Sequence, residues 1–172
     1  MLTAGHSNRA LDELIQILES HGVKQLADVR KMPRSRHNPQ FNSDSFAAAL
    51  RGLGIEYRHM PGLGGLRRPR SDSINTAWRN ESFRGYADYM QTAEFGRSLD
   101  ELIRYSRNAR TAILCAEAVP WRCHRSLIAD ALMAHGIAVE HIMSAARAEP
   151  HRITPFARVE GKRVTYPGLS ET

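Results

Sequence analysis

The chain of 172 residues has little cysteine and no long hydrophobic run, and both absences exclude classes of protein. No apolar stretch approaches the roughly 18 to 20 residues that span a bilayer, and no basic segment followed by an apolar one opens the chain. The two cysteines, Cys115 and Cys123, are too few for a disulfide framework and lie in one short segment. We therefore expect a cytoplasmic protein that neither crosses a membrane nor is secreted.

Low-complexity sequence is also scarce, which argues against a disordered or fibrous chain. Hydrophobic residues make up 42% and charged residues 24% of the sequence, as is typical of ordered globular proteins. The length falls within the usual range for one compact domain. We expect residues 1–172 to form a single domain, and the pattern specifies no oligomeric state.

Short apolar segments alternate with helical patterns along the chain. Strands are expected at residues 1–4, 25–29, 56–60, 111–115 and 138–142. Helices with apolar residues at helical spacing are expected at residues 11–18, 46–53, 82–90, 94–107 and 123–135. This alternation predicts a three-layer α/β domain, with a mostly parallel central sheet of about five strands and helices on both faces.

The remaining segments are less regular. Residues 61–76 are rich in glycine and arginine and are expected to form a mobile or ligand-covering loop. Residues 144–172 are expected to form a C-terminal extension packed on the domain. Within it, residues 157–159 and 163–166 are predicted to pair as a small hairpin across Glu160, Gly161 and Lys162.

Positive charge is concentrated in one third of the chain. Residues 30–84 carry eleven basic and four acidic groups, a net charge of +7, whereas the whole chain carries +6. Such a local excess favours an anionic ligand, whether a phosphate, a nucleotide or a nucleic acid. A basic, solvated surface with no ligand would show the same pattern.

Polar residues gather at three of the predicted strand ends, and in parallel sheets ligands bind at the carboxyl ends of strands. We expect these residues to meet at one edge of the sheet. They are His6, Ser7, Asp28, Arg30, Cys115 and Glu117. Those outside the cysteine segment, together with Arg34 and Arg125, are candidate substrate-binding residues, with Arg30, Arg34 and Arg125 contacting the anion.

The segment from Cys115 to Ser126 concentrates two thiols, a carboxylate, an imidazole and two guanidinium groups between a predicted strand and a predicted helix. A thiol at a helix N-terminus beside Arg or protonated His has a lowered pKa, which favours nucleophilic or redox chemistry. Cys123 is expected to be exposed and reactive, whereas Cys115 also fits a small buried hydrophobe. The candidate catalytic residues are Cys115, Glu117, Cys123 and His124.

Purely structural roles remain open as alternatives for several of these residues. Glu117 would also fit an ion pair with Arg122 or Arg125, and His6 would fit a capping role. Thiols, carboxylate and imidazole are metal-ligand types, but their spacing matches no strong zinc signature, so no metal is assigned and no cofactor is specified. Four aromatic residues lie near the basic region, and core packing explains them better than base stacking. They are Trp78, Phe83, Tyr86 and Tyr89.

Several motifs resemble the family called domain of unknown function 488, and together they span nearly the whole chain. They are Gly5-His6-Ser7-Asn8-Arg9, Asp28-Val29-Arg30, Pro33-Arg34-Ser35, Gly62-Leu63-Gly64-Gly65, Phe83-Arg84-Gly85-Tyr86-Ala87, Cys115-Ala116-Glu117 and Cys123-His124-Arg125. The family name implies no activity. The order of Asp28-Val29-Arg30, Cys115 and Arg125-Ser126 also resembles, more distantly, rhodanese-type sulfurtransferases and their related phosphatases.

Charge beside reactive groups favours an enzyme that acts on a phosphorylated, nucleotide or nucleic-acid substrate at the carboxyl edge of the sheet. Two hypotheses of other classes remain. The first is a noncatalytic nucleic-acid-binding module, indicated by the basic segment and its aromatic residues. The second is a metal-binding or redox module, indicated by the two cysteines.

Overall fold

The central layer is a six-stranded sheet in the order β3-β2-β4-β1-β5-β6, in a computed structural model that describes residues 1–169. All neighbouring strands are parallel except β5 and β6, which are antiparallel. The strands are β1 (Leu2–Gly5), β2 (Gln25–Asp28), β3 (Glu56–His59), β4 (Thr111–Cys115), β5 (Glu140–Ser144) and β6 (Arg147–Pro150).

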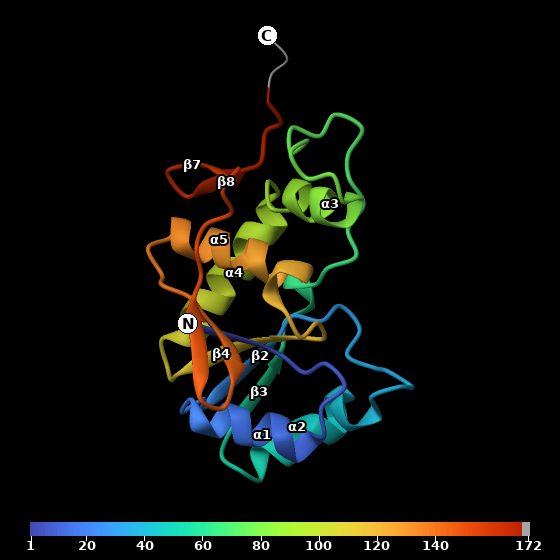
Figure 1. Ribbon diagram of the computed structural model, residues 1–172, viewed down its shortest axis with the longest axis vertical. Coiled ribbons are helices and arrows are strands. Elements are labelled where there is room, and N and C mark those ends of the chain that lie inside the picture. Colours follow the sequence, from blue (N-terminus) through green and yellow to red (C-terminus); the bar gives the residue numbers. More distant parts are fainter. Residues whose placement is uncertain (170–172) are drawn as a thin grey trace.

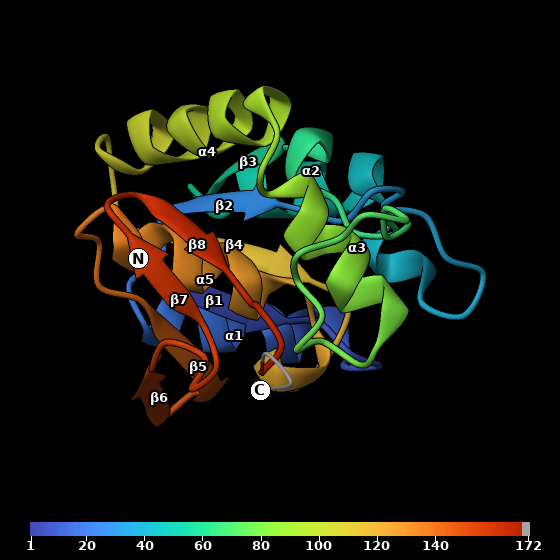
Figure 2. The ribbon, with the colours of Figure 1, turned by 90° about the horizontal axis from the view of Figure 1, so that it is seen from above.

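Helices cover both faces of this sheet (Figures 1 and 2). On one face lie α1 (Leu11–Ser20) and α2 (Ser43–Arg51), and on the other lie α4 (Ala93–Ser106) and α5 (Arg125–Ala134). The remaining helix, α3 (Glu81–Tyr89), lies beyond the carboxyl ends of the strands. The predicted three-layer α/β fold is therefore confirmed. None of the helices within residues 1–169 is long and apolar enough to cross a membrane.

The alternation of side chains along β4 determines which residues reach which layer. Ala112 and Leu114 pack into the core formed with α1 and α2, whereas Ile113 and Cys115 pack into the core formed with α4 and α5. Successive side chains of a strand point to opposite faces, so this division follows directly from the sequence. Consequently Cys115 emerges on the side of the sheet that α5 covers.

The central sheet has six strands, one more than the approximate number expected. Arg147–Pro150, which the sequence analysis assigns to a C-terminal extension of residues 144–172, forms β6 at the edge of the central sheet. Its side chains are exposed or half-buried. An edge strand without a buried face has no apolar alternation, which is the signal that sequence patterns use to find a strand.

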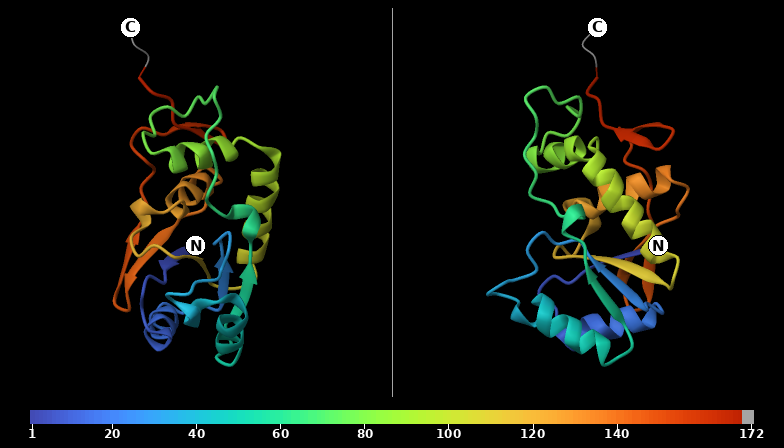
Figure 3. Two further views of the ribbon diagram at one scale, coloured as in Figure 1. Left: turned by 90° about the vertical axis from the view of Figure 1, so that its right-hand side faces the viewer. Right: turned by 180° about the vertical axis from the view of Figure 1, so that it is seen from behind.

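The predicted C-terminal hairpin is confirmed, as β7 (Arg158–Glu160) paired antiparallel with β8 (Arg163–Thr165). Gly161 has a φ of 60° in the turn, a conformation that glycine adopts without steric cost. The hairpin lies against the outer side of α5 (Figure 3). Val164 and Tyr166 are buried there and join the core on that side.

A buried chain of hydrogen bonds ties this C-terminal segment to the sheet. Asp130 of α5 is fully buried and accepts hydrogen bonds from His151 Nε2 at 2.7 Å and from the Tyr166 hydroxyl at 2.8 Å. Beyond it, His151 Nδ1 lies 2.8 Å from His141 Nε2, and His141 Nδ1 lies 2.6 Å from Thr3 Oγ1. The donors and acceptors alternate correctly along this chain when both histidines are neutral.

Acid should weaken the fold through His141, because burial and the neighbouring His151 lower the pKa of this histidine to about 3. The unfolded chain binds this proton near pH 6.5, so the free energy of unfolding should fall as the pH drops below that value, by up to about 1.4 kcal/mol per pH unit from this residue. Urea denaturation between pH 7 and pH 4 should show a shallower decline in His141→Gln than in the wild type. His37→Gln, at an exposed site, is the control. Equal slopes in His141→Gln and the wild type would contradict the prediction.

Candidate active site

Backbone hydrogen bonds hold the segments after β1, β2 and β4 together at the carboxyl edge of the sheet. The amide of His6 donates to Cys115 O at 3.0 Å, and that of Ser7 donates to Ala116 O at 2.8 Å. The amide of Val29 donates to Leu114 O at 3.0 Å. The residues that the sequence places at these strand ends therefore lie at one edge, but their side chains form two groups on opposite faces of the sheet.

The first group is a buried ion pair with its neighbours, on the face that α1 and α2 cover. Arg30 donates to both carboxylate oxygens of Asp28, from Nε at 2.9 Å and from Nη2 at 2.6 Å. Tyr57, which the sequence analysis did not single out, donates to the same carboxylate at 2.5 Å. His6 stacks on Phe41, and burial lowers the pKa of His6, so its Nε2 can accept from Arg30 Nη1 at 3.3 Å. Arg30 is thus committed to partners within the protein.

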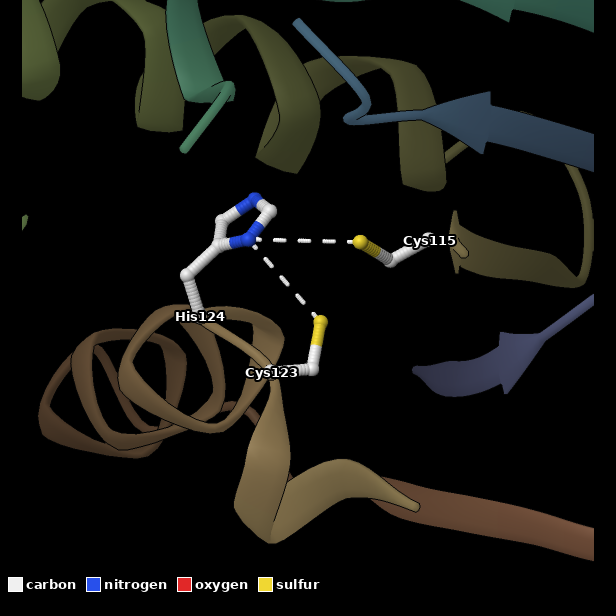
Figure 4. Close-up of side chains that lie close together, drawn as sticks. All are labelled: Cys115, Cys123 and His124. Carbon is white, nitrogen blue, oxygen red and sulfur yellow. Dashed lines mark hydrogen bonds between the residues drawn. The ribbon is translucent and has the colours of Figure 1, made fainter. Parts of the chain in front are cut away.

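The second group consists of Cys115, Cys123 and His124, on the face that α5 covers (Figure 4). Cys115 ends β4, and the other two residues lie in the turn that leads into α5. His124 Nδ1 lies 3.9 Å from the sulfur of Cys115 and 3.8 Å from that of Cys123. The two sulfurs and this nitrogen all lie within 4.8 Å of one another. The sequence places these residue types in one segment, and the fold brings their reactive atoms together.

Cys123 is buried, with 3% of its surface exposed, which corrects the expectation that it is exposed. The 3-10 turn η3 (Pro120–Arg122) precedes Cys123. Within it Trp121 points outward and is 62% exposed, and the chain then turns so that Cys123 points inward. Cys115 is also buried, at 7% exposure. Both sulfurs therefore belong to the core and to the site at once.

His124 is oriented by a backbone contact. Its Nε2 lies 3.3 Å from Val29 O, and because a carbonyl oxygen only accepts, Nε2 carries the proton. In the neutral ring Nδ1 then presents its lone pair to the two sulfurs. The ring of Tyr86 packs against His124 with 4.9 Å between ring centroids, which limits rotation of the imidazole.

The two thiols differ in acidity. A hydrogen bond with Cys123, together with burial, raises the pKa of Cys115 well above its usual range. The hydrogen bond from Cys115 lowers the pKa of Cys123 to about 7 against the effect of burial, helped by the charge and backbone amide of Arg125, whose N lies 3.5 Å from the sulfur. In the protein without bound ions, Cys123 is therefore the thiol that ionises first.

The side chain of Arg125 holds the turn between β4 and α5. It is 1% exposed and donates from Nη1 to Glu117 O at 2.6 Å and from Nη2 to Ala118 O at 3.0 Å. Gly5 allows this turn to approach β1, because a Cβ there would lie 1.7 Å from Glu117 O. Of the three arginines expected to contact an anion, Arg30 and Arg125 thus have internal partners, and Arg34 is exposed in the loop after β2.

An open cavity of about 440 Å³, here called the thiol cavity, adjoins the second group. Glu117, a predicted catalytic residue, is exposed beside it, and so is Arg122, which the sequence analysis considered only as a partner of Glu117. The lining residues are Gly65, Leu66, Asn80, Ser82, Phe83, Tyr86, Cys115, Glu117, Trp121, Arg122, Cys123 and His124. Gly65 and Leu66 come from the loop of residues 61–76, so that loop forms one wall of the cavity.

The aromatic residues near the basic segment serve mainly in packing. Tyr86 and Tyr89 are buried, and Trp78 and Phe83 are partly buried against the same core. The interpretation as core residues is confirmed for Tyr86 and Tyr89. Helical spacing in the sequence places Tyr86 and Tyr89 on α3. Their contacts with residues 61–67 become visible only in the structure.

The fold and the thiol cavity define an α/β protein whose candidate active site combines two thiols with an imidazole. The chain belongs to the family described as domain of unknown function DUF488, whose profile matches residues 10–132, a range that includes Cys115, Cys123 and His124. No curated protein and no solved structure significantly matches the chain. The expected family membership is confirmed, and the resemblance to rhodanese-type sulfurtransferases finds no support in these comparisons.

Replacing Gly5 with alanine should disrupt the turn that carries the site. The added methyl group would overlap the carbonyl of Glu117, so we expect Gly5→Ala to lower the free energy of unfolding by about 3 kcal/mol. Gly96→Ala is the matched control, because apart from the neighbouring residues and backbone of α4 itself nothing lies within 4 Å of the Cβ position at Gly96. That variant should gain up to about 1 kcal/mol, since alanine favours helix. Chemical denaturation measures both, and equal stability of the two variants would contradict the prediction.

Proposed function

We propose that the protein is an enzyme that acts on a phosphorylated or nucleotide-like substrate bound in the thiol cavity. One observation carries this proposal: the two thiols and the imidazole meet at the wall of an open cavity of about 440 Å³. That cavity adjoins the carboxyl ends of parallel strands, the place where α/β proteins bind their ligands. Reactive side chains beside a cavity large enough for a small molecule are the usual basis for such a hypothesis.

The residues have separate proposed roles. Cys115, Cys123 and His124 form the reactive centre. Glu117 is the carboxylate of the cavity lining, and its exposure lets it exchange a proton with a substrate or with water, as a general acid or base requires.

Charge supports an anionic substrate. Arg122 is exposed on the cavity and is the cation best placed to contact a phosphate there. Five of the uncharged lining residues, 65, 66, 80, 82 and 83, belong to the sequence segment of net charge +7. An excess of positive charge in the protein raises the local concentration of anions and favours their binding.

Turnover of a panel of nucleoside phosphates, sugar phosphates and p-nitrophenyl phosphate tests the proposal. Glu117→Gln should lower kcat on the order of 100-fold, the contribution expected of a general acid or base. Arg122→Ala should raise KM about tenfold, because a charged contact to the anion is lost. Glu19→Gln, at an exposed position of α1 on the opposite face, is the matched control and should leave both constants unchanged.

Two results would count against the proposal. Folded Glu117→Gln and Arg122→Ala proteins with wild-type kinetics would remove the proposed roles. Absence of turnover for every substrate, combined with single-stranded nucleic-acid binding that weakens steeply with salt and ignores Glu117→Gln, would favour the noncatalytic module instead. The exposed Trp121 beside Arg122 is the feature that such a module would use.

A further inference from the structure

We propose that Cys115, Cys123 and His124 bind one zinc ion through the two sulfurs and Nδ1, with the fourth coordination position facing the thiol cavity. The binding itself depends only on these three residues. The use of the metal in catalysis rests on the proposed function, and the experiments below separate the two.

The distances between the donor atoms fit a tetrahedral ion. Zinc lies about 2.3 Å from a thiolate sulfur and about 2.0 to 2.1 Å from an imidazole nitrogen, which places sulfur and nitrogen roughly 3.6 Å apart at tetrahedral angles. In the protein, His124 Nδ1 lies 3.9 Å and 3.8 Å from the two sulfurs. Tetrahedral zinc would hold the two sulfurs about 3.8 Å apart, and all three donor atoms lie within 4.8 Å of one another in the protein. Side-chain rotations that shift the donor atoms by up to about 1 Å would therefore close the site on an ion.

The imidazole is already oriented as a ligand. Metal-bound histidines usually donate their second ring N–H to a carbonyl or carboxylate, which fixes the tautomer and aims the free lone pair at the metal. Here the contact between His124 Nε2 and Val29 O, at 3.3 Å, leaves the Nδ1 lone pair facing the sulfurs (Figure 4). This contact is independent of the proximity of the two cysteines.

The ligand types select the metal. Two thiolates and an imidazole suit zinc, whereas magnesium and calcium require oxygen ligands. The group offers three protein ligands within residues 1–169, and zinc sites with three protein ligands keep a fourth position for water or substrate. Gly65 keeps space beside the site, because a Cβ there would lie 3.1 Å from His124 Nδ1.

A metal would also supply a positive charge that faces the cavity, which Arg30 and Arg125 do not. Arg30 and Arg125 are occupied by Asp28 and by the carbonyls of residues 117 and 118, so neither guanidinium is free to face the cavity. A zinc ion with an open position would offer a Lewis acid to a substrate oxygen there, next to Arg122.

Metal content and cobalt spectroscopy test the site. The full chain, purified under reducing conditions, should contain one zinc per chain by elemental analysis. After removal of zinc by a chelator, titration with Co²⁺ should produce thiolate-to-metal charge-transfer and tetrahedral ligand-field absorption that saturates at one equivalent. The readout is spectroscopic and needs no substrate.

Substitutions then assign the ligands. Cys115→Ala, Cys123→Ala and His124→Ala should each weaken Zn²⁺ affinity by more than about 100-fold, because loss of a ligand costs more than loss of a group that only orients one. His37→Ala should bind Zn²⁺ as the wild type does, since His37 is exposed and belongs neither to the group nor to the cavity lining.

The overturning result needs only the wild-type protein, so it holds even if the ligand variants do not fold. A folded, reduced chain that holds no zinc and leaves Co²⁺ with an octahedral spectrum would refute the site. Zinc bound without turnover of the phosphate panel would uphold the site and count against the proposed function. Full turnover by the zinc-depleted protein would uphold the enzyme and refute the use of the metal in catalysis.

Discussion

The site depends on one buried side chain, Arg125. Its guanidinium bridges the carbonyls of Glu117 and Ala118 and so pins the middle of the seven-residue connection between Cys115 and Cys123. Without these hydrogen bonds, two carbonyls of the turn would lose their donors from the buried guanidinium, and a typical hydrogen bond contributes about 0.5 to 1.5 kcal/mol to stability. A guanidinium suits this position because its fork of donors reaches both oxygens at once. Arg125 acts as a scaffold for the thiols and does not face the cavity.

The rest of the site is attached to this turn through the sheet. Gly5 of β1 accommodates the turn on one side, and the amides of His6 and Ser7 extend the β1–β4 pairing alongside it. At the end of β2, alternate residues contribute to opposite faces of the sheet. Asp28 and Arg30 form the buried ion pair on one face, and the carbonyl of Val29 between them orients His124 on the other. The two polar groups at this edge are therefore coupled by a single stretch of backbone.

Much of the fold could be predicted from the sequence because it depends on local patterns. The apolar periodicity of the buried strands and helices predicted the three layers, and Gly161 between two short strand patterns predicted the terminal hairpin. The sixth strand could not be predicted, because Arg147–Pro150 has no buried face to produce an alternation.

The sequence predicted where the candidate site lies in the chain, but not the burial or the hydrogen-bond partners of its side chains. Residue types marked the segment from Cys115 to Arg125, but burial of Cys123 depends on how η3 turns, and the partners of Arg30 and Arg125 depend on long-range packing. Tyr57 gave no signal, since nothing local distinguishes a tyrosine that donates to a buried carboxylate from one that only packs. The number of arginines in a segment does not reveal whether their guanidinium groups face a ligand or are bound to other groups of the same chain, as those of Arg30 and Arg125 are.

The central claim is that the turn held by Arg125 assembles Cys115, Cys123 and His124 into one centre, and zinc K-edge X-ray absorption on the purified protein tests it most directly. The expected spectrum contains two sulfur scatterers at about 2.3 Å and an imidazole nitrogen at about 2.0 to 2.1 Å, with one further light ligand in the open position. A coordination shell made only of oxygen and nitrogen would place the metal elsewhere and contradict the assembled centre.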